Sequence, residues 1–410
     1  MNPKKRVLLV IQYFFPSPGI TSKLYLDLAR VLVENGFDVT VFTSNRCHVS
    51  ENEISPLEEE KDGIHITRFS IPRIKTKIIS RFIQSFYLQK EIRLHFRTTN
   101  KHFDFAIVGS HPVFSYLMFH FFKKQQKDMK ILYWCFDLFP DGFIIGKKRV
   151  GNVFLLFRSV ITRALNNADI VADLGICMRK RLQVYTSAKN VTLTPWAFVE
   201  ENTLNIISQS EKEAVFNKHK FFFLFSGSVT YGRKLNVFID FVRYCKERDL
   251  DVALCIAGFG HFAARMKKEY HDCTDYILFM DYCDEAELRK RLSAADVHLL
   301  SLEDQATGCA VPSKFFAALA VGRPVVAAVS PESCIAHWIE QYKIGTVLRE
   351  NNFESSFLFI KKLYDDRDYA LSVQNNALSA YKKDFSRHVV TTRMVKIIND
   401  SIEQQQTPLL

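Results

Sequence analysis

The sequence predicts an α/β protein made of two doubly wound domains, each with a parallel sheet covered by helices. Two observations carry this prediction: strand and helix patterns alternate along nearly the whole chain, and the alternation restarts after a polar stretch that begins near residue 200. The chain has 410 residues. Because one hydrophobic core rarely organises a chain of this length, two domains are expected.

The first domain opens with a β-α-β unit. The apolar run Arg6–Gln12 is typical of a buried parallel strand. A Pro/Gly turn interrupts it, a helix capped by Thr21 or Ser22 follows, and the strand Asp38–Thr43 comes next. This order implies a right-handed crossover and a parallel sheet. Further strands are expected at Ile64–Phe69, Phe103–Gly109, Lys130–Trp134, Ile170–Leu174 and Val191–Thr194.

The second domain repeats the pattern after the polar interval Glu200–Lys220, which has no strong periodicity. We therefore expect the domain junction in that interval. The expected strands are Phe221–Ser226, Val252–Ala257, Tyr276–Met280, Val297–Ser301 and Pro324–Ala328, and the expected helices are Leu235–Arg248, Glu285–Ala294 and Ser313–Ala320. Two successive doubly wound halves are the architecture that this order favours.

Cysteine usage and hydropathy predict a cytoplasmic protein. The nine cysteines include no Cys-x-x-Cys pair, which is typical of free thiols in a reducing compartment. The apolar run Val7–Ile11 is too short for a signal peptide. The longest apolar run, Val113–Phe122, is about half the length that spans a bilayer.

The formal net charge of +11 is concentrated in the first half of the chain. Residues 1–200 hold 29 Lys/Arg and 17 Asp/Glu, whereas the remainder holds 26 and 27. The segments Arg73–Lys101 and Gly142–Leu165 combine basic residues with Phe and aliphatic residues at helical spacing. We interpret them as contacts with an anionic membrane surface, with helices packed on the sheet as the alternative. No motif that reads nucleic acid is present.

The segment Gly308–Pro324 contains the strongest local signal for an anion site. Ser313 is the expected N-cap of a helix, and Lys314 lies in its first turn, where free backbone N–H groups and the helix dipole favour an anion. A lysine is unfavourable there unless an anion offsets its charge. We therefore interpret the segment as a diphosphate site, with a solvated lysine as the alternative.

This segment resembles the donor-binding motif of family 4 glycosyltransferases of the GT-B fold. It is most similar to the bacterial subgroup that builds O-antigen and capsule repeat units, in which Val-Pro-Ser-Lys precedes a helix ending in Gly-Arg-Pro. The likeness covers nearly the whole chain. Other similar segments are Gln12–Pro16 with Gly19, Asp137–Pro140, Ala168–Arg179, Thr194–Trp196, Phe225–Gly227 and Ala257–Gly260.

The resemblance implies a GT-B architecture with its active site in the cleft between two Rossmann-like domains. The expected parts are an acceptor-side domain 1–198, a linker 199–220, a donor domain 221–384, and a C-terminal helix 385–410 that crosses back to the first domain. The implied activity is retaining, metal-independent transfer of a hexose from a UDP- or GDP-sugar co-substrate to a lipid-linked saccharide. No cofactor is expected, and the implied location is the inner face of the plasma membrane.

Site residues are carried over from the same motifs. The donor contacts would come from Gly19, Gly227, Gly258, Gly308 and Ser313, and Arg233 with Lys314 would neutralise the departing diphosphate. Asp137 ends a strand and is the candidate catalytic carboxylate, with a helix cap or turn residue as the alternative. His111 follows the strand Phe103–Gly109 and is a candidate on the acceptor side, with a turn histidine as the alternative.

The chain departs from the wider family at its two donor glutamates. Their positions hold Cys309 and Ala317, which cannot accept the same hydrogen bonds. Glu303 is a replacement candidate for the ribose contact, with an exposed loop carboxylate as the alternative. The departure keeps open a non-catalytic GT-B-like partner of another glycosyltransferase. The alternative enzyme is a GT-B sugar-nucleotide epimerase.

Overall fold

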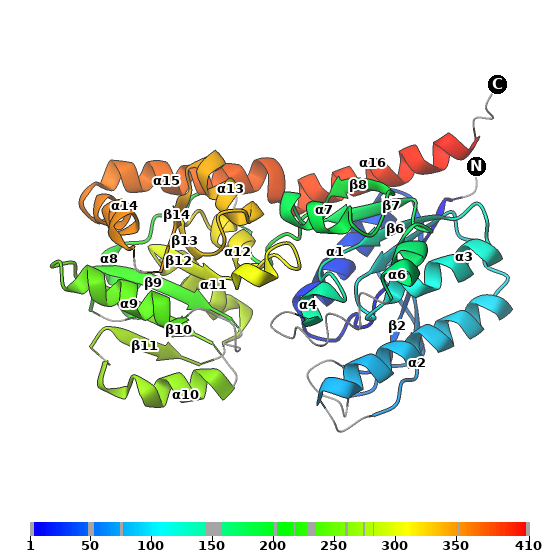
Figure 1. Cartoon of the computed structure of the whole chain (residues 1–410), viewed down its shortest axis with the longest axis horizontal. Coiled ribbons are helices and arrows are strands. Elements are labelled where there is room, and N and C mark those ends of the chain that lie inside the picture. The colour runs from blue at the N-terminus through cyan, green and yellow to red at the C-terminus, as the bar shows by residue number, and fades with distance from the viewer. Residues whose placement is uncertain are drawn as a thin grey trace. The chain divides into compact units, whose positions relative to one another are not determined.

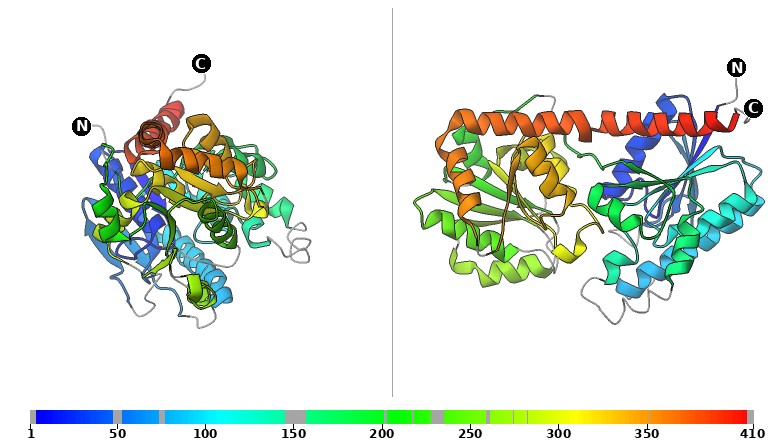
Figure 2. Two further views of the ribbon diagram at one scale, coloured as in Figure 1. Left: turned by 90° about the vertical axis from the view of Figure 1, so that its left-hand side faces the viewer. Right: turned by 45° about the horizontal axis from the view of Figure 1, so that its top comes forward.

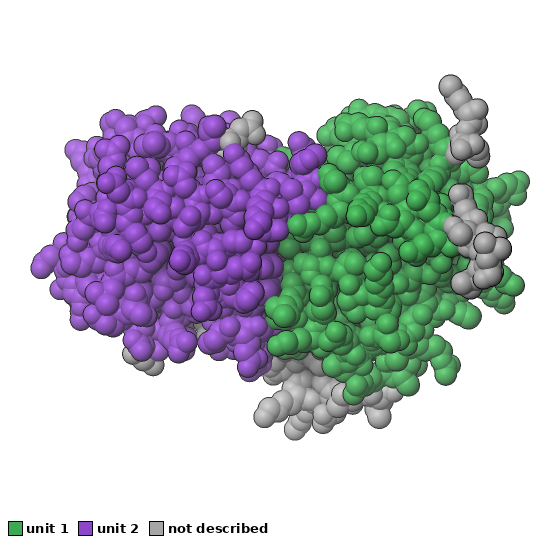
Figure 3. Space-filling model, turned by 90° about the horizontal axis from the view of Figure 1, so that it is seen from above, with its two compact units in different colours: residues 1–194, 308–310, 390–410 green, residues 195–307, 311–389 purple. Residues whose placement is uncertain are grey.

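The computed structural model describes residues 4–47, 53–73, 77–144, 157–200, 203–216, 218–227, 235–258, 261–273, 275–281, 283–350 and 352–406. The chain forms two compact units (Figure 3). Unit 1 comprises Met1–Thr194, Gly308–Ala310 and Val390–Leu410, and unit 2 comprises Pro195–Thr307 and Val311–Val389.

Unit 1 is built on one twisted sheet with the strand order β3-β4-β2-β1-β5-β6-β7-β8 (Figure 1). All neighbouring pairs are parallel except β3 and β4, which are antiparallel. The strands are β1 Arg6–Val10, β2 Asp38–Ser44, β3 Glu58–Lys61, β4 Ile64–Phe69, β5 Phe105–Gly109, β6 Lys130–Trp134, β7 Ile170–Asp173 and β8 Lys189–Thr192. The central strands are buried, and Val7–Val10 and Phe105–Val108 are fully inaccessible to solvent.

The helices of unit 1 cover both faces of this sheet. They are α1 Ile20–Glu34, α2 Lys77–Thr98, the 3-10 turn η1 Ser115–Met118, α3 Phe119–Gln125, α4 Asp141–Ile144, α6 Arg158–Leu165 and α7 Ile176–Leu182. The amphipathic spacing of Leu24, Leu28 and Leu32 explains why α1 buries one face completely.

Unit 2 has a six-stranded, wholly parallel sheet with the order β11-β10-β9-β12-β13-β14. The strands are β9 Phe221–Ser226, β10 Val252–Ala257, β11 Ile277–Met280, β12 Val297–Ser301, β13 Val325–Ala328 and β14 Gly345–Val347. The run of phenylalanines in β9 supplies both faces of the sheet, because Phe221, Phe223 and Phe225 enter one core cluster and Phe222 enters the other.

The helical elements that the structure describes in unit 2 follow or flank these strands. They are α8 Gln209–Val215, α9 Leu235–Lys246, α10 His261–Glu269, η2 His271–Cys273, α11 Glu285–Ala294, η3 Asp304–Ala306, α12 Lys314–Ala320, α13 Cys334–Tyr342, α14 Glu354–Asp365, α15 Arg367–Ala380 and the π-turn η4 Tyr381–Phe385. The segment expected to be a linker, 199–220, is counted with unit 2. It contains α8, whose start is closed by a reciprocal capping box between Ser208 and Glu211.

Each sheet changes the direction of its strand order at one place. In unit 1 the change lies between β1 and β5, and in unit 2 it lies between β9 and β12. Doubly wound sheets bind ligands outside the carboxyl ends of their strands at such switch points. The loops after these four strands are therefore where the fold places a site.

The C-terminal helix α16, Arg387–Gln406, contributes its residues from Val390 onward to unit 1 (Figure 2). Val390, Met394, Ile398 and Ile402 are buried, each exposing 3 % or less of its surface. The lysine that precedes β1, Lys5, bonds to Asn399 and lies 3.7 Å from Glu403. In the described part of the chain no helix is both long and apolar enough to cross a membrane.

Replacing Ile398 with alanine is expected to destabilise unit 1 by about 2–5 kcal/mol, because the side chain is fully buried and leaves a cavity. Lys396→Ala, on an exposed position of the same helix, should change stability by less than about 0.5 kcal/mol. Urea unfolding followed by circular dichroism measures both. Equal stability of the two variants would mean that α16 does not support unit 1.

Candidate active site

In unit 1 a cavity of about 340 Å³ opens at the switch point of the sheet. Its walls come from the loop after β1, the start of α1 and the loop after β5. Gln12, Gly19 and His111 all line it, so residues almost a hundred positions apart in the sequence share one cavity. The fold therefore brings together two of the residues expected at the site, Gly19 and His111.

The start of α1 lines this cavity, and no side chain caps the backbone N–H groups there. Gly19 is the N-cap residue, with a φ of 152° that favours glycine, and no side chain caps the helix. The expected caps, Thr21 and Ser22, lie inside the helix instead. Because Ile20, Thr21 and Ser22 are the first helical residues, their N–H groups are not used by the helix, and the positive end of its dipole favours an anion here.

A buried polar network holds the loop after β1 in place. The Gln12 side chain is 2 % exposed and accepts a hydrogen bond from the hydroxyl of Ser85 at 2.9 Å. The same hydroxyl accepts from the N–H of Val113, and the side chain of Gln89 donates to the carbonyl of Val113. This network was not expected from the sequence, because its bonds join α2 to loops that are far away along the chain. Gln84, Ser85 and Gln89 are buried on α2 beside its apolar residues.

His111 and Asp137 form a pair at the carboxyl ends of β5 and β6. The His111 Nε2 lies 3.1 Å from an Asp137 carboxylate oxygen, and both side chains are partly exposed. Because a carboxylate only accepts, Nε2 is the donor in this bond. Ser110, which the sequence analysis did not select, accepts hydrogen bonds from the N–H groups of Phe136 and Asp137 and so fixes the carboxylate-bearing loop.

In unit 2 the carboxyl end of β9 meets the start of α12. The Lys314 Nζ lies 3.4 Å from the ring centroid of Phe225, a distance at which the ring face attracts a cation. Gly227 has a φ of 112°, and a Cβ at this position would lie 3.0 Å from Lys314 Cε. The backbone at 227 therefore favours glycine, and the Lys314 side chain lies close against it. Its N–H donates to Ala257, the last residue of β10, which precedes Gly258.

The remaining donor candidates occupy different places. Ser313 is the N-cap of α12, but its hydroxyl makes no cap hydrogen bond, because its backbone is already helical, with φ −62° and ψ −20°. The expected side-chain cap is thus wrong. Glu303 is half-buried at the start of the 3-10 turn η3. Arg233 lies outside the described residues.

Gly308 belongs to unit 1, whereas Gly227 and Lys314 belong to unit 2. A Cβ on Gly308 would lie 2.5 Å from the carbonyl oxygen of Cys177 in α7, so no larger residue fits. The carbonyl of the next residue, Cys309, accepts a hydrogen bond from Leu138 at 2.8 Å. The structure therefore gives Gly308 a packing role against α7, and its donor contact remains a prediction.

Cys309 is buried, so its side chain has almost no exposed surface with which to contact a donor in place of the family's glutamate. The side chain is 2 % exposed. Burial raises the pKa of its thiol to about 11, so the thiol stays protonated at neutral pH. Among the residues that the structure describes, no three His, Cys, Asp or Glu side chains gather closely enough to hold a metal ion.

Proteins of known structure share the two-domain α/β architecture of this chain. Residues 220–366 match the model of the family described as Glycosyl transferases group 1. Sucrose-phosphate synthase from Thermosynechococcus elongatus superposes with a TM-score of 0.73 at 13 % identity, covering 98 % of this chain and 100 % of that one. HepE from Anabaena, solved with UDP-glucose, gives a TM-score of 0.64 at 13 % identity, with coverages of 96 % and 99 %.

The chain has the GT-B fold. Among curated proteins, a probable glycosyltransferase of Pseudomonas aeruginosa, WbjE, is 22 % identical over 290 residues, which are 68 % of this chain and 70 % of WbjE. The matched family region contains Gly227 and Lys314, and the GT-B neighbours align over almost the entire chain. Fold class was therefore predicted correctly from the alternating pattern and the motif resemblance.

Proposed function

We propose that this protein is a retaining glycosyltransferase that moves a hexose from a nucleoside-diphosphate sugar, with UDP or GDP as the leaving group, to a saccharide acceptor. The observation that carries the proposal is the placement of Lys314 over Phe225 and against Gly227, at the switch point of unit 2 and inside the matched family region. The bond that breaks joins the anomeric carbon to a diphosphate oxygen, and the new bond joins that carbon to an acceptor oxygen.

The chemistry that this chain must supply is mainly electrostatic. As the anomeric bond breaks, negative charge grows on the leaving diphosphate, and a fixed ammonium group stabilises that charge more in the transition state than in the ground state. Lys314 and Arg233 are proposed for this role. In unit 1 we propose that the N–H groups at the start of α1 bind a phosphate oxygen or a sugar hydroxyl. We propose that His111, which Asp137 orients, binds a hydroxyl of the reacting sugars.

The activity is tested by incubating the protein with UDP- and GDP-sugars and measuring the released nucleoside diphosphate, with and without saccharide acceptors. Acceptor-dependent release with retention of the anomeric configuration supports the proposal. Conversion of the nucleotide sugar into its epimer would favour an epimerase. Nucleotide binding without turnover would favour a non-catalytic partner, the alternative raised by Cys309 and Ala317, and either result would contradict the proposed transfer.

We further propose that the acceptor is lipid-linked, that the reaction contributes to a surface polysaccharide such as O-antigen or capsule, and that the protein lies on the inner face of the plasma membrane. Support comes from the outer face of α2, which exposes Phe86, Tyr87 and Leu94 at 45–48 % each while polar residues of the same helix are buried. These exposed aromatic and aliphatic side chains lie in water unless a partner covers them.

Unit 1 has a second exposed apolar edge on α6. Phe157 and Val160, at the start of α6, are each 52 % exposed. Arg158 and Arg163 line a shallow depression on the same helix. Both α2 and α6 pack against η1. An anionic bilayer suits helices that present exposed cations, Lys90 and Arg97 on α2 and Arg158 and Arg163 on α6, beside exposed aromatic side chains.

Charge reversal on α2 is expected to release the protein from anionic vesicles. Each basic residue near such a surface contributes about 1 kcal/mol, so Lys90→Glu with Arg97→Glu should weaken binding by roughly tenfold or more. Arg93 is unsuitable for this test, because it donates to the carbonyl of Leu117. The matched control is Lys180→Glu with Lys189→Glu, at exposed positions elsewhere on unit 1.

Vesicle flotation at low salt measures this binding, and added salt should release the unmodified protein. The α2 variant should still use a short-chain soluble acceptor while losing activity on a vesicle-embedded one. If the unmodified protein fails to float with anionic vesicles, the proposed membrane contact is wrong.

A further inference from the structure

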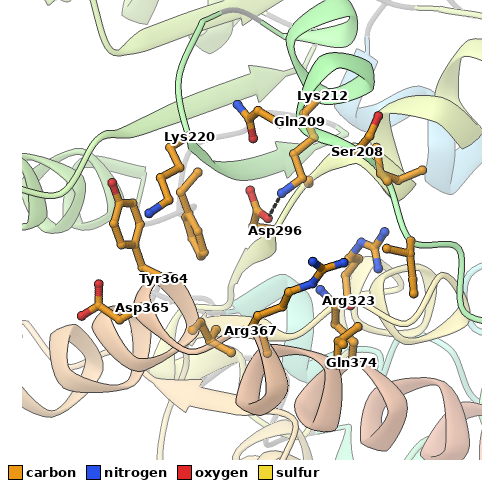
Figure 4. A pocket seen from close by; sticks show the side chains of 17 residues that line it. Ser208, Gln209, Lys212, Lys220, Asp296, Arg323, Tyr364, Asp365, Arg367 and Gln374 are labelled. Carbon is orange, nitrogen blue, oxygen red and sulfur yellow. Dashed lines mark hydrogen bonds and ion pairs between the residues drawn. The ribbon is translucent and has the colours of Figure 1, made fainter.

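Unit 2 contains a second cavity, at the edge of its sheet opposite the candidate donor site. The cavity, which we call the rear pocket, measures about 670 Å³. Its lining, drawn in Figure 4, includes Lys212, Lys220, Phe221, Asp296, Arg323 and Arg367. Phe221 begins β9, and Asp296 and Arg323 come just before β12 and β13. All three therefore lie at the amino ends of parallel strands.

The rear pocket is separated from Lys314 and Gly227 by the length of the sheet. β9 runs from Phe221 at the rear pocket to Ser226 beside Gly227. Six residues of strand span roughly 20 Å. A ligand in the rear pocket would therefore be distinct from the donor proposed above.

The charge of the rear pocket favours an anion. Four cationic side chains, Lys212, Lys220, Arg323 and Arg367, face two carboxylates, Asp296 and Asp365, which leaves a formal charge of +2. Lys212 is paired with Asp296, and Asp365 is already paired with Lys361 outside the lining. Among the described residues, neither Lys220 nor Arg367 forms a salt bridge with a carboxylate.

Contacts with the protein hold two of these cations, Arg323 and Lys220, in place. Arg323 is 3 % exposed and donates to the carbonyl oxygens of Ser293 and Asn205. These bonds fix the guanidinium without neutralising its charge. The Lys220 Nζ lies 3.9 Å from the ring centroid of Tyr364, which positions it at the rim. Figure 4 shows Lys220, Arg323 and Arg367 arranged around the same space, with Lys212 joined to Asp296.

The charge and the lining side chains of the rear pocket indicate which anion it would bind. A phosphate monoester carries a charge close to −2 at neutral pH, which matches the formal charge, and offers three acceptor oxygens to the lysine and arginine N–H groups. Behind the cations lie the ring of Tyr364, the side chains of Ile207 and Leu371, and the amide of Gln374. An aromatic face, aliphatic surface and an amide suit a small hydroxylated body attached to the phosphate.

We propose that the rear pocket binds a phosphate monoester of a small hydroxylated molecule, of the sugar-phosphate class, at a site separate from the nucleotide-sugar donor. Ribose 5-phosphate is the probe, and isothermal titration calorimetry of the full chain measures its binding. Inorganic phosphate and ribose, the two parts of the probe, should each bind more weakly than the intact ester.

The decisive variant is Lys220→Gln with Arg367→Gln. Both residues are exposed and outside the proposed catalytic machinery, so the unfolding midpoint should stay near that of the unmodified protein. Losing two charged donors should weaken binding of ribose 5-phosphate by about tenfold or more. The matched control, Lys267→Gln with Lys268→Gln on α10, removes the same charge from an exposed surface and should bind normally.

Lys314→Ala separates the two sites, because it changes the donor end alone and should leave binding of the probe unchanged. The proposal is overturned if ribose 5-phosphate does not bind, or if the Lys220/Arg367 variant binds it as well as the control does. It is also overturned if Lys314→Ala abolishes binding, or if inorganic phosphate binds as tightly as the ester. None of these outcomes depends on whether the protein transfers sugar.

Discussion

Lys314→Ala is expected to reduce turnover by roughly two orders of magnitude or more, the usual cost of removing one preorganised charge-stabilising group. The reason is local: the ammonium group lies over the ring of Phe225, and glycine at 227 leaves room for the lysine side chain. Because the charge acts on the leaving diphosphate, kcat should fall more than KM rises. Steady-state kinetics with the native donor measures both.

The matched control for this variant is Lys290→Ala, an exposed lysine on α11 that should leave turnover unchanged. Arg233→Ala is expected to cost a similar factor, in keeping with its predicted role beside Lys314. Both site variants should unfold at the temperature of the unmodified protein. Near-normal turnover of either variant would show that its cation does not stabilise the leaving group.

His111→Ala is expected to reduce turnover by about 10²- to 10⁴-fold if the imidazole exchanges a proton with a reacting hydroxyl. Asp137→Ala should have a smaller effect, because the carboxylate only orients the ring through the 3.1 Å bond to Nε2. Asp137→Asn should recover part of that loss, since an amide oxygen still accepts from Nε2. If the two residues had only a structural role, the three variants would not show this graded loss of turnover.

His120→Ala provides the comparison for His111, since this histidine is exposed on α3 away from the cavity. Single-turnover measurements with saturating donor and acceptor separate the chemical step from binding. If His111→Ala and Asp137→Ala reduce the chemical step equally, or not at all, the assigned division of roles is wrong.

Much of the fold could be predicted because the sequences of buried parallel strands consist mainly of apolar residues. The expected strands Ile64–Phe69, Lys130–Trp134, Phe221–Ser226 and Val297–Ser301 have the same bounds in the structure. β3, with the sequence Glu-Glu-Glu-Lys, was missed because an antiparallel edge strand needs no apolar face. β14 has only three residues and is too short for a periodic signal.

The candidate site was predictable where local sequence determines it. Gly227 and Lys314 come from two motifs that the parallel sheet brings to one edge. The bonds of Gln12 with Ser85 and of Ser110 with the Asp137 loop join segments 26 to 73 residues apart, so no local pattern announces them. The packing of Gly308 against Cys177 was not predictable for a similar reason, because tertiary packing brings the two residues together.

The composition of unit 1 has a consequence for biosynthesis. Two of its buried apolar residues, Ile398 and Ile402, follow Thr194 by about 200 residues. A ribosome that adds roughly 5–20 residues per second needs on the order of 10–40 s to reach them. During that time the nascent first half carries an uncovered apolar strip where α16 will pack, a surface suited to chaperone contact. The first half to be translated is therefore expected to be the last to reach its full stability.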